Sequence, residues 1–179
     1  QRATDEGTRH VAVGQIDYAR PFDNDNKLEL GAKSIIRSAD NDFAFENLEP
    51  GTGEWENDPN VSNRFIYGEQ VYAAYGIYSQ TLGSWKLSAG STLEYTRIDT
   101  ELKTTGEEND QRYLNLFPSA TALYTLNDMN SFKLTYSRRI DRPNSWRLNP
   151  FPDIADTLNI RLGNPNLQPE FIQSLEVGH

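Results

Sequence analysis

The sequence predicts an all-β protein: an antiparallel up-and-down meander of about seven long strands that forms part of a transmembrane β-barrel. Three observations support this prediction. Apolar and polar residues alternate with a period of two in segment after segment, and helical periodicity is almost absent. Short turns alternate with long polar connections. The strands, at roughly 10 to 16 residues, exceed the mode of about 5 to 6 in soluble proteins, and outer-membrane barrels combine both properties.

The first predicted hairpin consists of strands 11–19 and 27–38, joined by a turn at 20–26 that is rich in Pro, Asp and Asn. The stretch 23–26, Asp-Asn-Asp-Asn, superficially resembles a calcium-binding loop. It lacks the glycine at the sixth position and the bidentate glutamate at the twelfth that an EF-hand requires. We interpret it as a turn, because Asp and Asn side chains hydrogen-bond to their own backbone.

The second predicted hairpin covers residues 65–98, where two alternating segments flank a turn at 81–84 that contains glycine. In its first segment, 65–80, the odd positions carry the larger apolar side chains, although Glu69 is among them. We expect these odd positions to face lipid, with Tyr67 and Ile77 near the two ends of the apolar span. The even positions are smaller and more polar and are expected to face inward.

In the second segment of this hairpin, Trp85 and Tyr95 bracket an apolar face, and Lys86, Glu94 and Thr96 lie on the opposite, polar face. The ~10 residues between the two aromatic side chains span about 33 Å at about 3.3 Å per residue. A tilt of about 40° reduces this to roughly 25 Å, the height of the apolar band in an outer-membrane barrel with aromatic girdles. The apolar face is therefore expected to meet lipid, and the polar face to line a wide barrel.

The remaining predicted strands are 112–125, 131–140 and a last one from about residue 170, with a short turn at 126–130. In segment 131–140, Phe132, Leu134, Tyr136 and Ile140 share the face opposite Lys133 and Arg139. The long polar connections are predicted at 39–64, 99–111 and 141–169. This order of hairpin and long loop is typical of outer-membrane barrels, which have short periplasmic turns and longer extracellular loops.

The composition excludes several classes of function. The chain has 179 residues and a net charge of −9, and its isoelectric point near 4.7 argues against nucleic acid as a partner. The absence of cysteine excludes disulfides, zinc–thiolate sites and cysteine nucleophiles. The two histidines, His10 and His179, lie at opposite ends of the chain, so we expect no metal site and no cofactor. No apolar run approaches the roughly 18 to 20 residues of a membrane-spanning helix.

No set of catalytic residues emerges, so we do not expect an enzyme. A placed Ser–His–Asp arrangement, a phosphate-binding glycine loop and a metalloprotease helix are all absent from the sequence. Glu69 and Glu94 lie on adjacent strands and suggest the paired carboxylates of a glycosidase. The faces assigned above put Glu69 on the apolar side and Glu94 on the polar side, so these two carboxylates are not expected to converge.

Eight side chains in or beside the long connections are candidate ligand or rim contacts. Four arginines form a basic cluster in an acidic protein, either bracing a strand end and a loop through salt bridges or contacting an anion or lipopolysaccharide at the barrel rim. Four aromatic residues either stack on a sugar or siderophore ring or pack one loop against another. The acidic loops at 40–42 and 54–60 are solvated or gather cations weakly. The eight candidates are Arg138, Arg139, Arg142, Arg147, Trp55, Tyr113, Trp146 and Phe151.

Three stretches carry a resemblance to a known family. They are 137–151 (SRRIDRPNSWRLNPF), 163–170 (GNPNLQPE) and 115–124 (NLFPSATALY). In their residues, order and spacing they resemble the barrel of TonB-dependent outer-membrane receptors of the Bacteroidetes type. The resemblance implies a barrel of about 22 strands around an N-terminal plug. It also implies import of a large or scarce nutrient, such as siderophore-bound iron, cobalamin or an oligosaccharide, across the outer membrane of a Gram-negative cell.

The sequence departs from this family pattern in having no plug domain, no recognisable TonB box and no terminal aromatic strand end. We therefore expect residues 1–179 to form one partial barrel domain, an internal piece of a receptor. Its expected partners are outer-membrane lipid and lipopolysaccharide, with TonB acting only through an N-terminal part outside this chain. The isolated piece is expected to curl over itself or to self-associate, because sheet edges and apolar patches drive association. The alternative is a soluble β-sheet adhesin or carbohydrate-binding module, whose apolar face is buried against a second sheet.

Overall fold

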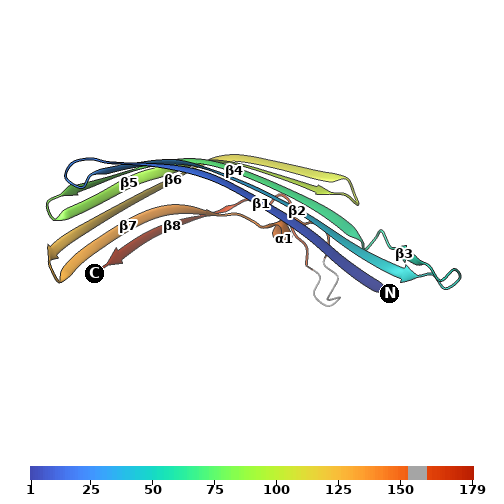
Figure 1. The fold of residues 1–179 in the computed structure, drawn as a ribbon. Helices are drawn as coiled ribbons and strands as arrows, with labels where there is room; N and C mark the ends of the chain where they lie inside the picture. The colour runs from blue at the N-terminus through green and yellow to red at the C-terminus, as the bar shows by residue number, and fades with distance from the viewer. Residues whose placement is uncertain (153–160) are drawn as a thin grey trace.

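The computed structural model describes residues 1–152 and 161–179. These residues form one antiparallel sheet with the strand order β1-β2-β4-β5-β6-β7-β8, and the short β3 pairs with β2. The sheet is bent into an arch, and the single short helix lies beneath its concave side (Figure 1). The predicted all-β meander is thereby confirmed. The elements are β1 (Arg2–Pro21), β2 (Lys27–Leu48), β3 (Trp55–Asn57), β4 (Asn63–Leu82), β5 (Trp85–Leu102), β6 (Glu107–Asn127), β7 (Asn130–Asp141), α1 (Ser145–Leu148) and β8 (Glu170–Gly178).

The β1–β2, β4–β5 and β6–β7 connections lie together at one end of the sheet, which we call the turn end, and the opposite end is the loop end (Figure 1). The turn predicted at 23–26 is confirmed: Asn24 and Asp25 have φ angles of 60° and 58°, and the Phe22 amide donates to the Asn26 carbonyl at 2.8 Å. Gly83 turns the β4–β5 hairpin with φ at 58°. Such left-handed conformations favour Gly, Asn and Asp, which explains why these turns could be predicted.

The prediction of a long connection at 99–111 is wrong. β5 continues to Leu102 and β6 begins at Glu107, so that only residues 103–106 connect them. The polar residues here are paired across strands, since Arg97 on β5 lies 2.9 Å from the Asp110 carboxylate on β6. Opposite charges on facing strands support pairing beyond the apolar part of a sheet. For the same reason the predicted connection 39–64 is too long, because β2 extends to Leu48 and β3 lies within the remainder.

The convex face of the sheet carries a continuous apolar band. The strand register places Trp85 beside Tyr124, Leu93 beside Leu116, and Tyr72 beside Tyr95 on this face. The rings of Trp85 and Tyr124 lie 4.7 Å apart near the turn end. The face assignment predicted for residues 85–98 and 131–140 is confirmed. The band also includes the exposed side chains of Ile16, Tyr18, Leu30, Ile36, Tyr78, Leu87, Leu114, Phe132, Leu134, Leu175 and Val177.

The face assignment predicted for residues 65–80 is wrong. The odd positions of β4 lie on the concave face, where Phe65 and Tyr67 are buried, whereas Tyr72 and Tyr78 are exposed on the convex face. Large apolar side chains occur on both faces of this strand, so alternation alone does not tell which face points inward. Pairing with β5, whose two faces differ clearly, determines the orientation of β4.

A small apolar core lies under the loop end of the concave face. Phe65 and Tyr67 of β4 and Ile98 and Leu102 of β5 surround Leu148 of α1, which is fully buried. This core is far too small to be the interior of a sandwich, and its effect is to hold α1 against the sheet. Within the described residues no helix is long and apolar enough to cross a membrane.

Candidate functional site

The residues around α1 have a local conformation that the sequence encodes directly. Asn144 is the N-cap, and its side-chain oxygen accepts a hydrogen bond from the Arg147 amide at 3.1 Å. Asparagine is among the preferred residues at this position. The helix comprises only Ser145–Leu148. Since Leu148 points into the core and Trp146 is 70% exposed, this single turn anchors itself on one side and presents an aromatic ring on the other.

The segment that begins at Arg161 folds back onto α1. The Gly163 amide donates to the Asn149 carbonyl at 2.9 Å, and the Asn164 amide donates to the Arg147 carbonyl at 2.7 Å. A Cβ atom on Gly163 would lie only 2.3 Å from the Asn149 carbonyl oxygen, so glycine is required for this close approach. The side chain of Gln111 on β6 also donates to the Pro165 carbonyl at 2.6 Å. The family-like stretches 137–151 and 163–170 thus form one folded unit around α1 on the concave face.

A buried ion network connects this unit to the sheet. Arg142, in the connection after β7, forms an ion pair with Glu94 and lies 3.9 Å from the carboxylate of Glu69. Arg37 of β2 also pairs with Glu69, which is almost fully buried. Burial lowers the pKa of the Arg142 guanidinium, but neighbouring Glu69 opposes this shift and favours the charged form.

The expectation that Glu69 and Glu94 do not converge is wrong. Both side chains face the concave side of the sheet. The expectation failed because it rested on the wrong face assignment for β4. Arg142 lies between the two carboxylates and pairs with both. The arrangement is a charge-compensated brace, in which an arginine binds two carboxylates of neighbouring strands and fixes the start of the connection that carries α1.

A pocket of about 660 Å³ lies between this unit and the loop ends of β1, β2 and β4 on the concave face. Its volume falls in the range of roughly 300–1,000 Å³ that is typical of small-molecule sites. Strand residues form one wall, and α1 with its flanking segments forms the other. The lining residues are Asp5, Asn41, Phe43, Asn63, Ser145, Trp146, Arg147, Asn149, Phe151, Pro152, Arg161, Leu162, Gly163, Asn164 and Leu167.

Three of the four aromatic candidates lie in or near this unit, and one does not. Trp146 and Phe151 line the pocket. Tyr113 of β6 packs against the apolar core beside α1. Trp55 of β3 lies elsewhere at the loop end, with the Arg2 guanidinium 4.7 Å from the centre of its ring. The structure therefore brings Trp146 and Phe151 together and leaves Trp55 outside.

The four arginine candidates do not form one cluster. Arg138 lies on the convex face, with its guanidinium 4.5 Å from the ring centre of Phe171. Arg139 is exposed on the concave face, because neighbouring residues of a strand point to opposite sides. Arg142 belongs to the buried ion network, and Arg147 lines the pocket. The four side chains thus have four different environments.

The pocket also contains residues that were not predicted from the sequence. Asn63 is 5% exposed, and within the described residues its side-chain oxygen has no hydrogen-bond partner. The strand register places Phe43 of β2 opposite Asn63 and Asp5 of β1 opposite Phe43, so that these three residues follow one another across the pocket wall. A sequence signal marked only those that lie in the family-like stretches 137–151 and 163–170, namely Ser145, Asn149, Gly163, Asn164 and Leu167. Strand register, which alternation alone does not specify, is what unites the others.

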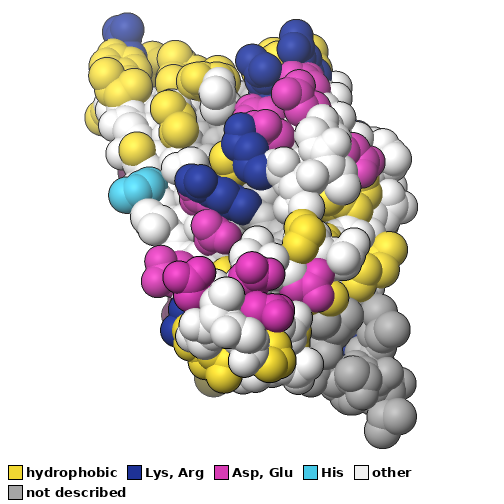
Figure 2. Space-filling view, turned by 90° about the vertical axis from the view of Figure 1, so that its right-hand side faces the viewer, with side chains coloured by type: hydrophobic (Ala, Val, Ile, Leu, Met, Phe, Trp, Pro, Cys, Tyr) yellow, Lys and Arg dark blue, Asp and Glu magenta, His cyan; other side chains and the backbone are white. Residues whose placement is uncertain are grey.

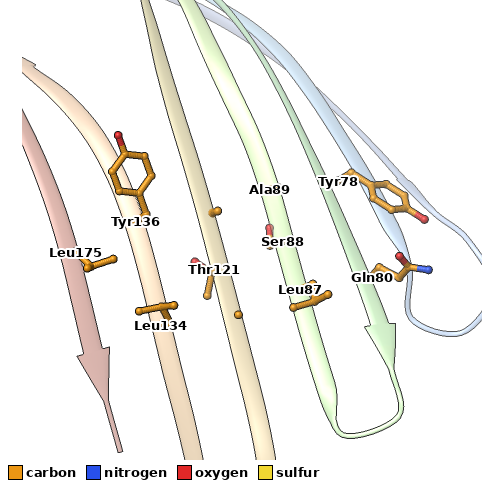
Figure 3. A pocket seen from close by; sticks show the side chains of 11 residues that line it. Tyr78, Gln80, Leu87, Ser88, Ala89, Thr121, Leu134, Tyr136 and Leu175 are labelled. Atoms are coloured by element: carbon orange, nitrogen blue, oxygen red, sulfur yellow. The ribbon is translucent and has the colours of Figure 1, made fainter.

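Two further surfaces differ from this pocket. A shallow apolar groove of about 320 Å³ lies on the convex face near the turn end, between Leu87, Leu134, Leu175 and Tyr136 (Figure 3). Its position within the apolar band makes it part of the lipid-facing surface. At the loop end, acidic and basic side chains lie side by side (Figure 2). Among the residues that the structure describes, no three His, Asp or Glu side chains are grouped so as to hold a metal ion.

A curved antiparallel meander with an apolar convex band and a polar concave face is a segment of an outer-membrane β-barrel. The model of the outer membrane protein beta-barrel family matches residues 1–179, and the chain belongs to this family. The fold class predicted from the sequence and its location in the outer membrane are thereby confirmed. The resemblance to outer-membrane receptors noted in the three motifs is confirmed at the level of family and fold.

Two solved structures show the same fold. The copper transporter OprC matches with a TM-score of 0.74 and 13% sequence identity, over 98% of this chain and 28% of its own. The ferric citrate transporter FecA in its unliganded form matches with a TM-score of 0.56 and 17% identity, over 79% of this chain and 22% of its own. The chain therefore spans less than a third of the length of either structure. No curated protein matches it.

Proposed function

We propose that this chain forms part of the barrel wall of a TonB-dependent outer-membrane receptor that imports a large or scarce nutrient, such as siderophore-bound iron, cobalamin or an oligosaccharide. The observation that carries the proposal is the two-faced sheet. Its convex band suits lipid, and its concave face holds ion pairs and a pocket of small-molecule size. The motifs around α1 support the receptor class, and the two solved structures of the same fold are a ferric citrate transporter and a copper transporter.

In this proposal residues 1–179 are one partial barrel domain. Further strands of the receptor pair with the two outer strands β1 and β8, each of which has a neighbour on one side only. TonB acts through an N-terminal part of the receptor outside this chain. Isolated in water, the 179-residue chain self-associates through these strand edges and the apolar band.

The convex face supplies the lipid partners. Membrane lipid covers the band between Trp85 and Tyr95, and lipopolysaccharide meets the charged rim beyond it. Arg112 and Arg64 lie on this rim, each paired with an aspartate. Arg138 is on the same face, next to Phe171. Guanidinium groups bind phosphate in a bidentate manner, which suits these side chains to the phosphates of lipopolysaccharide.

The two faces can be tested directly because the chain has no cysteine. Residues 92 and 93 are neighbours on β5, and their side chains point to opposite faces of the sheet. Leu93→Cys and Thr92→Cys therefore serve as a matched pair. Each substitution is made in the complete protein that the gene encodes. The variant is produced in the outer membrane, and its cysteine is labelled with a nitroxide. Oxygen, which partitions into lipid, is expected to relax the Leu93 label more strongly, and a water-soluble nickel chelate the Thr92 label. In the alternative, a soluble adhesin, the Leu93 label is buried against a second sheet and protected from both reagents.

Import is tested in cells that carry the gene, with and without a functional TonB. The cells receive ferric siderophores, cobalamin or oligosaccharides as the limiting source of iron, cobalamin or carbon. We expect uptake of one of these nutrients to require both the gene and TonB. If deletion of the gene changes the uptake of none of these nutrients, the proposal is contradicted.

A further inference from the structure

Asn63 has an unusual environment for a buried amide. It is the first residue of β4, it is 95% shielded from solvent (5% exposed), and it lines the pocket beneath α1. Within the described residues its Oδ1 atom has no hydrogen-bond partner. An unpaired buried acceptor is unfavourable by about 1–3 kcal/mol, so such atoms call for an explanation. A ligand that donates a hydrogen bond to Oδ1 supplies one.

The missing group is a donor, and this narrows the ligand chemistry. A carbonyl-type oxygen accepts from a hydroxyl or an N–H group. Carboxylates, phosphates and the deprotonated oxygens of an iron chelate carry no such hydrogen. The floor of the pocket is therefore suited to a ligand that presents hydroxyl or N–H groups.

The walls of the pocket add two further requirements. Trp146 and Phe151 offer aromatic faces to a flat or ring-shaped apolar surface. The amides of Asn41 and Asn164 offer both donors and acceptors, and the guanidinium groups of Arg147 and Arg161 offer further donors for hydroxyl oxygens. A ring with an apolar face and a rim of hydroxyl groups satisfies both requirements at once, which describes a pyranose sugar.

We infer that this pocket binds the end of an oligosaccharide, with Asn63 accepting a sugar hydroxyl and Trp146 stacking on a sugar ring. This inference rests on the proposed receptor function and selects one of its nutrient classes. The volume of about 660 Å³ suits a small ligand or the end of a longer one rather than a folded macromolecule.

The test is isothermal titration calorimetry on the complete, detergent-solubilised protein that the gene encodes. The ligands are three oligosaccharides (maltohexaose, cellohexaose and xylohexaose) and two iron chelates (ferric citrate and ferric enterobactin). We expect one neutral oligosaccharide to bind and both iron chelates to show no binding. Asn63→Ala and Trp146→Ala should each weaken oligosaccharide binding about tenfold, the equivalent of 1.4 kcal/mol. Asn63→Asp, which keeps an acceptor at Oδ1, and Trp146→Phe, which keeps an aromatic ring, should restore most of the affinity.

Two matched variants control for unspecific effects. Trp55→Ala removes a loop-end tryptophan outside the pocket, and Asn115→Ala removes a concave-face asparagine outside it. Both should leave the oligosaccharide affinity unchanged. Because Trp146 is largely exposed, Trp146→Ala is expected to fold normally, so the inference stays testable if Asn63→Ala does not.

Three outcomes overturn the inference: binding of an iron chelate in place of a sugar, binding of none of the oligosaccharides, or sugar binding that Trp146→Ala leaves unchanged. In each case TonB-dependent uptake of another nutrient leaves the proposed receptor function intact. If the protein is instead found outside the outer membrane, the receptor function itself fails.

Discussion

Arg142 is ion-paired with Glu94, and this contact joins the connection after β7 to the middle of the sheet. The same guanidinium lies 3.9 Å from Glu69 on the neighbouring strand. Arg142 precedes α1 by only a few residues, so the brace determines where the helix meets the sheet. The position of Trp146 in the pocket depends on it.

The first prediction concerns this brace. Arg142→Ala leaves Glu94 without its partner and Glu69 with Arg37 alone, both on a largely buried part of the sheet. Breaking a buried pair by removing one partner is unfavourable by about 3–5 kcal/mol. We expect the free energy of unfolding to fall by about 3 kcal/mol, measured by urea unfolding in lipid vesicles. Arg139→Ala, in the same motif but exposed, should change it by less than about 0.5 kcal/mol. Equal effects of the two variants refute the brace.

The second prediction concerns the lipid-facing band. Ala120 lies on the convex face, opposite Ala89 and midway along the band, and Ser119 beside it points to the concave side. Arginine on the lipid face at mid-membrane is unfavourable by about 2–4 kcal/mol. Ala120→Arg should therefore reduce the free energy of unfolding in vesicles by about 3 kcal/mol, whereas Ser119→Arg should have little effect. A larger loss from Ser119→Arg would mean that the faces are reversed.

The third prediction concerns the close contact between Gly163 and the end of α1. Gly163→Ala places a Cβ atom against the carbonyl oxygens of Asn149 and Arg147. Overpacking of this kind is unfavourable by about 1–3 kcal/mol. We expect the unit around α1 to open more often, so that trypsin cleaves after Arg147 about tenfold faster. Gly51→Ala is the control, because its Cβ has ample space. An unchanged cleavage rate in Gly163→Ala argues against the docked arrangement.

The fourth prediction concerns the apolar anchor of α1. Leu148 is fully buried among Phe65, Tyr67, Ile98 and Leu102. Truncation of a buried leucine to alanine is unfavourable by about 2–5 kcal/mol. Leu148→Ala should lower the free energy of unfolding by about 3 kcal/mol, measured by the urea midpoint. Leu48→Ala, at an exposed strand end, should shift the midpoint only slightly, and a similar shift in both variants contradicts an anchoring role.

Much of the fold was predictable because its determinants are local. The turns at Asn24–Asp25 and Gly83 follow from residues that tolerate positive φ. The faces of β5 and β7 follow from strict alternation, with Trp85 and Phe132 on the convex side. The importance of the stretch around Trp146 was also predictable, since it carries the family-like motif.

The strand ends and the faces of β4 were not predictable from pattern alone. Asp110 reads as a loop residue in the sequence, but it is the partner of Arg97 across two strands. Phe65 and Tyr67 read as lipid-facing, but Leu148, far along the chain, covers them. Both errors arise from contacts between residues that are distant in sequence.

The sequence by itself determined that the protein consists of long two-faced strands with an apolar side for lipid, because alternation with a period of two leaves no other regular structure. The tertiary structure alone decided which side of β4 points inward, how Arg142 joins Glu69 to Glu94, and that Asn63 and Trp146 line one pocket. The physical reason is that alternation makes two faces different but does not orient them. Pairing with neighbouring strands and the packing of α1 do that.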